Sequence, residues 1–253
     1  MVERVDGEAG YLLHSRPYRE SSQLLDLFTL NHGRIRAVAK ATRQRTKRGA
    51  FTGLVPFSCY QLSWSGRGEL KNLVRAEPVE AGRFLRDEAL FSGLYLNELI
   101  YRLLHEHDPH PQLYHCYQQL LITLGHTALA VDERQLRDFE MVLLEELGYG
   151  LVLDCEAASG EPLLAEGRYD YRADLGAVPG RSYSGAELLA IGGGELNQPH
   201  VRAAAKRLLR SAIDFHLDGR TLNSRLLYRQ YLDSQPRSAG ALSEQPPVSE
   251  EEL

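Results

Sequence analysis

The hydrophobic pattern of this chain changes its period near Pro78, and this change constrains the fold more than any other feature. Before Pro78, apolar residues alternate with polar ones in short runs, as at Tyr60, Leu62 and Trp64. Such alternation is typical of strands, whose successive side chains point to opposite faces. After Pro78, apolar residues recur at helical spacings. We therefore expect an α+β protein in which a strand-rich part precedes a mainly α-helical part.

The strand-rich part is short for the number of strands that it predicts. We expect strands over residues 10–15, 24–30 and 34–40 and a hairpin over 60–64 and 69–75. Five or so short strands in eighty residues favour a small closed or half-closed barrel, such as an OB-fold. We assign residues 1–80 to an OB-fold nucleic-acid-binding domain. Residues 81–233 form a helical domain with an irregular, metal-free insert near 151–181, and residues 234–253 form a disordered acidic tail.

Capping residues locate the expected helices. We place Asp87 at the N-cap of a first helix that ends near Asp108-Pro109, and a second helix after Pro111. Asp132 caps the third helix, whose apolar stripe ends before Gly148. Ser184 caps a short helix, and further helices are expected over 199–217 and 223–232.

Positive charge is concentrated in one segment of a chain whose net charge is −5. Residues 33–49 contain no acidic residue and seven cations, which are Arg34, Arg36, Lys40, Arg43, Arg45, Lys47 and Arg48. Alternation along the expected strand directs Ile35, Ala37 and Ala39 inward and makes the opposite face largely basic. We predict that this face and a mobile loop at 42–47 bind phosphate, together with Arg67 and Lys71 of the second hairpin. A solvated loop with spare arginines is the alternative.

A second basic surface is expected near the carboxyl end of the chain. Arg202, Lys206 and Arg210 are four residues apart, so they form one row along a helix. We predict that this row also contacts DNA phosphates. An ordinary solvated helix face would carry the same pattern.

Signatures of catalysis are absent from the sequence. It contains neither a Gly-x-Ser-x-Gly elbow nor a Gly-x-x-x-x-Gly-Lys-Ser/Thr loop, and the Gly192–Gly194 run lacks a following lysine. The histidines near residues 105–115 lack the spacing of a zinc site, and the three cysteines are far apart. We expect no enzyme activity, no cofactor and no metal. A generic OB-fold RNA-binding protein and an unrecognised hydrolase are the alternatives.

Apolar runs are too short for a membrane span, and no secretory signal is recognisable at the amino end. An odd number of widely spaced cysteines fits a reducing compartment. We expect a cytoplasmic, nucleoid-associated protein without membrane contact.

Several segments resemble, in order, the bacterial recombination mediator family RecO. They are LLHSRPYRES at 12–21, HGRIRAVAK at 32–40, GRGE at 66–69, LYLNEL at 94–99, Phe139-Glu140, LGYG at 147–150 and Ser224-Arg225. The resemblance implies an OB-fold joined to a helical domain and a non-enzymatic role in the RecF pathway of DNA repair and recombination. It also implies binding of single- and double-stranded DNA, annealing of complementary strands and, with RecR, loading of RecA onto DNA coated by the single-stranded DNA-binding protein SSB.

Two residues bear on what the resemblance implies for metal and partners. Many family members carry two Cys-x-x-Cys pairs after the Gly-Tyr-Gly motif, whereas Cys155 stands alone here. We therefore expect a metal-free version of that segment. The family also binds the acidic, apolar-ended SSB tail on its helical domain. Arg137 is our candidate for pairing with the tail carboxylates, and an ordinary exposed arginine is the alternative.

Overall fold

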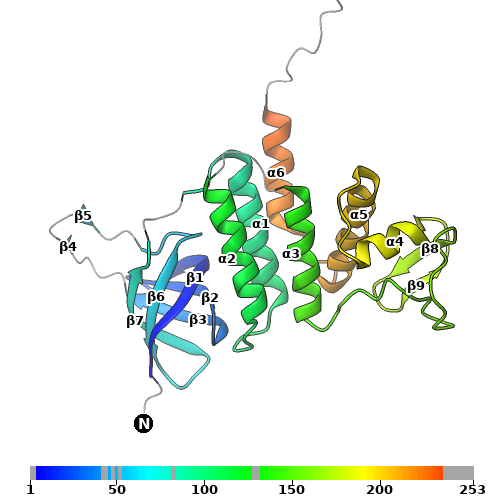
Figure 1. Ribbon diagram of the computed structural model, residues 1–253. Coiled ribbons are helices and arrows are strands. Elements are labelled where there is room, and N and C mark those ends of the chain that lie inside the picture. The colour runs from blue at the N-terminus through cyan, green and yellow to red at the C-terminus, as the bar shows by residue number, and fades with distance from the viewer. Residues whose placement is uncertain are drawn as a thin grey trace, which may run out of the picture.

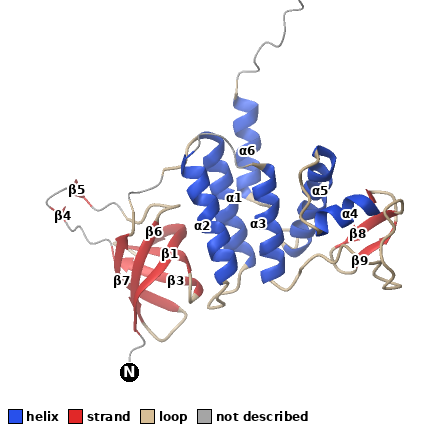
Figure 2. Ribbon diagram, viewed as in Figure 1, coloured by secondary structure: helices blue, strands red, loops and turns tan. Residues whose placement is uncertain are grey.

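The computed structural model describes residues 4–40, 45–46, 49–50, 53–80, 84–126 and 132–235. A closed β-barrel lies at one end of the molecule, three helices lie next to it, and a smaller helical region with a short sheet forms the other end (Figure 1). The barrel strands precede all the helices in the chain, and a second, short sheet lies beside α4 (Figure 2). The expected α+β architecture is confirmed.

Five strands close the barrel in the order β1-β2-β3-β7-β6. They are β1 (Arg4–Tyr18), β2 (Ser22–Thr29), β3 (Gly33–Lys40), β6 (Cys59–Ser65) and β7 (Leu70–Pro78). All neighbouring pairs are antiparallel except β3 with β7, which run parallel. Of the loop predicted at 42–47, the structure describes only β4 (Arg45–Thr46), which pairs with β5 (Gly49–Ala50).

The barrel interior follows the alternation expected from the sequence. Ile35 and Ala37 of β3 are fully buried, and Ala39 packs against the same cluster. The remaining buried members of this cluster are Leu12, Leu25, Leu27, Tyr60, Leu62 and Trp64. These residues fill the barrel because every second side chain of each strand points inward.

A second core joins the barrel to the helices. Tyr11 of β1 and Phe28 of β2 point out of the barrel and contact Tyr114 and Tyr117 of the second helix, with ring centroids 5.1–5.9 Å apart. Buried Asn97 donates to the carbonyl of Leu13 at 3.1 Å, where the β1–β2 register is interrupted. The barrel and helices therefore share one continuous apolar core.

The helices are α1 (Asp87–Leu103), α2 (Pro111–His126), α3 (Glu133–Glu146), α4 (Gly185–Gly192), α5 (Pro199–His216) and α6 (Asn223–Ser234). Asp132 and Ser184 cap α3 and α4 as predicted, and Ser184 forms a full capping box with Glu187. The prediction for Asp87 was wrong, because Asp87 is the first helical residue and its side chain makes no cap bond. Helix α1 also ends at Leu103, earlier than expected, because Leu104 takes up extended backbone.

The segment expected to be irregular contains a small sheet. Strands β8 (Arg168–Arg172) and β9 (Gly176–Pro179) lie inside residues 151–181, and β10 (Tyr183–Ser184) pairs with β8 just beyond them. The strands are two to five residues long, and this is why the sequence pattern did not reveal them.

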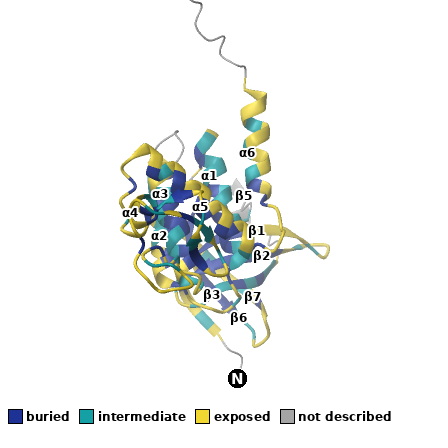
Figure 3. Cartoon of the chain, turned by 90° about the vertical axis from the view of Figure 1, so that its right-hand side faces the viewer, coloured by how far each residue is buried: buried dark blue, intermediate teal, exposed yellow. Residues whose placement is uncertain are grey.

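Helix α6 extends beyond the bundle and is exposed over most of its length (Figure 3). Its start is fixed by Glu98 of α1, whose carboxylate accepts from the backbone N–H groups of Asn223 and Ser224 at 2.9 and 2.8 Å. Within the described part of the chain, no helix combines the length and apolar character needed to cross a bilayer.

Candidate nucleic-acid interface

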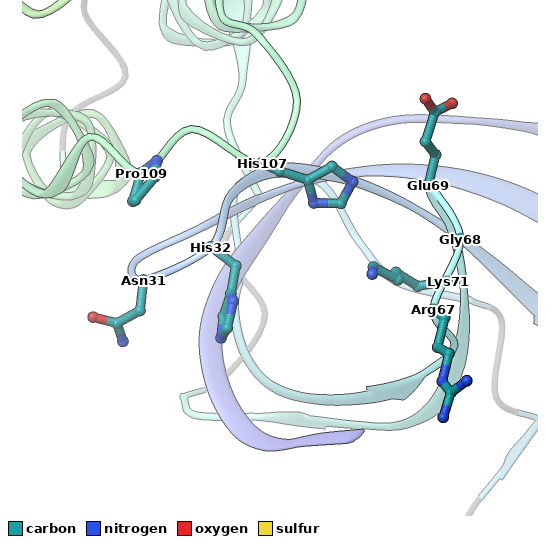
Figure 4. A pocket seen from close by; sticks show the side chains of 8 residues that line it. All are labelled: Asn31, His32, Arg67, Gly68, Glu69, Lys71, His107 and Pro109. Carbon is teal, nitrogen blue, oxygen red and sulfur yellow. The ribbon is translucent and has the colours of Figure 1, made fainter. Parts of the chain in front are cut away.

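A cleft of about 370 Å³ lies where two barrel loops meet the α1–α2 loop, which comprises residues 104–110. We name it the junction cleft. The residues that line it are Asn31, His32, Arg67, Gly68, Glu69, Lys71, His107 and Pro109 (Figure 4). Two of the predicted DNA-binding cations, Arg67 and Lys71, therefore lie in one concave site together with two histidines.

Lys71 is the most buried cation of the cleft. Its side chain belongs to β7, is only 7% exposed and donates to the Gly66 carbonyl at 3.3 Å. Its ammonium group points into the cleft toward His107, whereas Glu69 points away (Figure 4). The Glu69 carboxylate instead lies 3.3 Å from the guanidinium of Arg36. The side chains that face the opening are therefore mainly cationic or polar.

The α1–α2 loop is packed closely against the β2–β3 turn. Gly33 has φ +63°, and a Cβ atom at this position would lie 2.0 Å from the carbonyl oxygen of Asp108. His107 also has a left-handed backbone, with φ 63°, and its N–H donates to the Arg34 carbonyl at 2.9 Å. Only glycine allows the turn to approach this closely, so the wall of the cleft depends on Gly33.

Arg34 has a different role from the one predicted. Its side chain is 14% exposed and lies 3.4 Å from both Asp26 and Glu106. Its Nε donates to the Leu104 carbonyl at 3.2 Å. Burial raises the pKa of Asp26, and the positive charge of Arg34 opposes this shift. Arg34 is thus an internal link between the barrel and the α1–α2 loop, and its part in DNA binding stays a prediction.

Arg36 makes a similar link at the rim of the cleft. Its Nε lies 2.8 Å from the carboxylate of Glu106, and its terminal Nη2 lies 3.3 Å from the carboxylate of Glu69. The hydrogen bond that Arg36 donates to the Glu106 carboxylate raises the pKa of Arg36. The positive charge of the largely basic face expected on β3 is therefore partly offset, because Arg34 and Arg36 pair with carboxylates.

Lys40, at the end of β3, is exposed. The predicted cations Arg43, Lys47 and Arg48 lie outside the described residues, and Arg45 is described only by its place in β4. Their part in DNA binding stays a prediction.

The predicted row on α5 is paired with nearby oxygen atoms. Lys206 lies 2.6 Å from Glu133 of α3, and Arg210 lies 3.8 Å from Asp214. Arg202 donates to the carbonyls of Leu196 and Asn197, just before its own helix. Side chains of Lys206 and Arg210 remain more than half exposed, so contact with DNA phosphates stays a prediction.

Arg137 is neither an exposed arginine nor an accessible site for a peptide. Its side chain is 7% exposed and lies 2.9 Å from Glu140, which is 1% exposed. The Tyr95 hydroxyl donates to Glu140 at 2.7 Å, and Arg225 of α6 reaches Tyr95. Burial raises the pKa of Glu140, and the Arg137 charge opposes this shift. Arg137 therefore stabilises a buried charge, and its contact with the SSB tail stays a prediction that this burial does not favour.

Metal binding was not expected, and the structure offers no candidate site for it in the described ranges. No group of three or more His, Cys, Asp or Glu side chains converges there. Cys155 is a free thiol, as are Cys59 and Cys116.

Sequence reasoning missed half of the junction cleft. No binding role was predicted for Asn31, His32 or His107, and Pro109 was expected only at the end of a helix. Residues 32 and 107 are far apart in the chain, so no local pattern could have shown that they line one site. The histidine-rich composition of residues 105–110 was the one available signal.

Comparisons with known proteins cover nearly the whole chain. Residues 7–81 match the family described as Recombination protein O N terminal, and residues 88–226 match Recombination protein O C terminal. The DNA repair protein RecO of Methylococcus capsulatus is 48% identical over 231 residues, covering 89% of this chain and 94% of the relative. Its counterpart in Alkalilimnicola ehrlichii is 44% identical over 247 residues, covering 94% and 96%. The counterpart in Pseudomonas aeruginosa is 42% identical over 232 residues, covering 90% and 96%. The chain belongs to the RecO family of DNA repair proteins.

Proposed function

We propose that this protein is a repair mediator without catalytic activity. It binds single- and double-stranded DNA, anneals complementary strands and, with RecR, helps to load RecA onto SSB-coated DNA at the nucleoid. Family membership supports the repair role. The observation that supports DNA binding is the junction cleft, in which Arg67 and Lys71 of the closed barrel line one concave site.

The annealing activity follows from charge neutralisation. Two DNA strands repel each other through their phosphates, and a protein cation that binds a phosphate releases counterions and lowers this repulsion. Lys40, Arg67 and Lys71 supply such charges near the barrel, and the basic segment 43–48 adds to them. Bases that remain outside these contacts are free to pair.

We assign partner binding to residues 81–233 and DNA binding to residues 1–80. Because Arg137 is buried, exposed cations on α3 and α5 are the better candidates for the acidic SSB tail. Arg134 is 46% exposed and Lys206 57% exposed at the side chain. Arg134 lies on α3 and Lys206 on α5, and the ion pair between Lys206 and Glu133 links these two helices. Of the proposed acidic tail at 234–253, residues 236–253 lie outside the described residues, and Ser234 is the last residue of α6.

The test is an annealing assay with complementary DNA oligonucleotides, with and without SSB, over a salt series. We expect annealing above the spontaneous rate on naked and SSB-coated strands, with a steep decline as salt increases. Binding of structured RNA without DNA annealing would instead support the generic RNA-binding alternative. Metal-dependent nuclease or nucleotidase turnover would contradict the absence of catalysis.

A further inference from the structure

We propose that the junction cleft binds a nucleic-acid backbone phosphate between Lys71 of the barrel and His107 of the α1–α2 loop, and that protonation of His32 and His107 tightens this contact. The inference rests on the proposed function and specifies where and how one phosphate is bound. The strand would thereby touch the barrel and the helical part at the same time.

The donors of the cleft come from three separate segments and converge on one space. Asn31 and His32 belong to the β2–β3 turn, Arg67 and Lys71 to the β6–β7 hairpin, and His107 to the α1–α2 loop. The Lys71 ammonium points into the cleft and is nearly shielded from bulk water (Figure 4). A charge in such a setting attracts an anion more strongly than a fully solvated charge does.

The acidic side chains around the cleft are engaged with other groups. Glu8 accepts from the backbone N–H of Asn31 at 2.6 Å and from its side-chain amide at 3.1 Å. Glu69 and Glu106 pair with Arg36, and Glu106 also pairs with Arg34. Asp108 lies 3.5 Å from the ring of His110. Arg34 and Arg36 therefore offset the charges of Glu69 and Glu106, and hydrogen bonds from Asn31 hold Glu8, so an anion in the cleft meets mainly positive and polar groups.

The position of His107 is fixed before any ligand arrives. Its left-handed backbone is uncommon for a residue with a side chain, and strained residues of this kind concentrate at binding sites. The bond to the Arg34 carbonyl and the close contact between Gly33 and Asp108 hold the loop in place. The His32 ring packs against Trp64 in a T-shaped arrangement, with ring centroids 5.2 Å apart. Both rings are therefore preorganised.

Imidazole is the side chain whose charge ordinarily changes between about pH 5 and pH 8. The other charged groups that surround the two rings are Glu8, Arg34, Arg36, Arg67, Glu69, Lys71, Glu106 and Asp108, with His105 and His110 on the same loop. Carboxylates, lysines and arginines ordinarily keep their charges over that interval. Histidine is thus the side-chain type of the cleft through which a fall in pH can add positive charge beside the phosphate.

The experiment measures the affinity of the full chain for a fluorescent oligothymidylate at pH 6 and pH 8 over a salt series. We expect Lys71→Gln and Arg67→Gln each to weaken binding about tenfold, the effect of losing one bond to a charged group. We expect Lys71→Gln also to lower the slope of log affinity against log salt by about one. Arg75→Gln, on β7 outside the cleft, is the matched control and should change little.

The histidine arm uses the double variant His32→Gln/His107→Gln. It should abolish the gain in affinity that the wild type shows on acidification, whereas His115→Gln, on the exposed face of α2, should retain it. Lys71→Arg keeps the positive charge and should retain binding. Because Arg67 is exposed, Arg67→Gln should have little effect on folding. Wild-type binding that is unchanged by Lys71→Gln, Arg67→Gln and the double variant would overturn the cleft site alone. Failure of the wild type to bind DNA would overturn the proposed function itself.

Discussion

Arg34 of β3 and Glu106 of the α1–α2 loop form an ion pair 3.4 Å long across the boundary between the barrel and the helices. Arg36 binds the same carboxylate at 2.8 Å, so one acid joins two cations of the segment that is most basic in the sequence. Positive charge in this segment therefore helps to hold the barrel and the helices together.

The first prediction concerns this shared carboxylate. Glu106→Gln should lower the free energy of unfolding by about 1–3 kcal/mol, because Arg34 stays largely buried without its full partner. Urea denaturation followed by circular dichroism measures this change. Glu77→Gln, whose partner Arg75 is well exposed, is the control and should have an effect below about 1 kcal/mol. Equal effects of the two substitutions would show that the boundary pair adds nothing to stability.

The second prediction concerns the close approach at Gly33. Gly33→Ala adds a Cβ atom where the Asp108 carbonyl lies, so it should both destabilise the protein and displace the α1–α2 loop. Gly148→Ala is a matched control, because Gly148 also has positive φ but an added Cβ would meet no atom within 4 Å. Backbone strain alone costs about 1–3 kcal/mol in both variants. Thermal denaturation should show a larger loss at Gly33, and a loss no larger than at Gly148 would contradict the packing argument.

The third prediction separates the structural role of Arg137 from partner binding. Arg137→Ala leaves Glu140 buried without its cation and should cost about 3–5 kcal/mol of stability. Arg134→Ala, on the exposed side of the same helix, should cost less than about 1 kcal/mol. Chemical denaturation of both variants tests this difference. A stable Arg137→Ala protein that fails to bind an SSB tail peptide would restore Arg137 to the partner site.

The fourth prediction concerns the ion pair between α3 and α5. The hydrogen bond from Lys206 lowers the pKa of Glu133 below the usual 4.5. A carboxylate with a lowered pKa stabilises the folded state above pH 4.5, and this contribution is lost as the pH falls through the pKa of the folded protein. Lys206→Met should therefore shift the Glu133 titration upward in a carboxyl-detected NMR experiment. An unchanged midpoint would show that the two side chains do not interact in solution.

Local patterns in the sequence predicted those parts of the structure that depend on neighbouring residues. Alternation at Ile35 and Ala37 located the inner face of β3, and Asp132 and Ser184 began their helices because their side chains bind N–H groups two or three residues away. Asp87 has the right chemistry for a cap but the wrong backbone, with φ 48°. A sequence pattern does not report that angle.

The remaining features depend on contacts between residues that are far apart in the sequence. Arg137 is one position from the apolar stripe of α3 and resembles a surface residue in sequence. Tyr95 of α1 and Arg225 of α6 complete the buried cluster around Glu140, and neither could be paired with it from spacing. Arg34 and Glu106 could not be paired from their spacing in the sequence either. The residues lining the junction cleft were therefore only partly predictable.

The aromatic contacts among Tyr11, Phe28, Tyr114 and Tyr117 have a practical consequence. They place large apolar side chains on the outer wall of the barrel, where only the helices shield them from water. A fragment truncated after residue 80 would expose this wall and would tend to aggregate. The two halves of the protein thus depend on each other for solubility, and substitutions within the intact chain are the sounder way to dissect them.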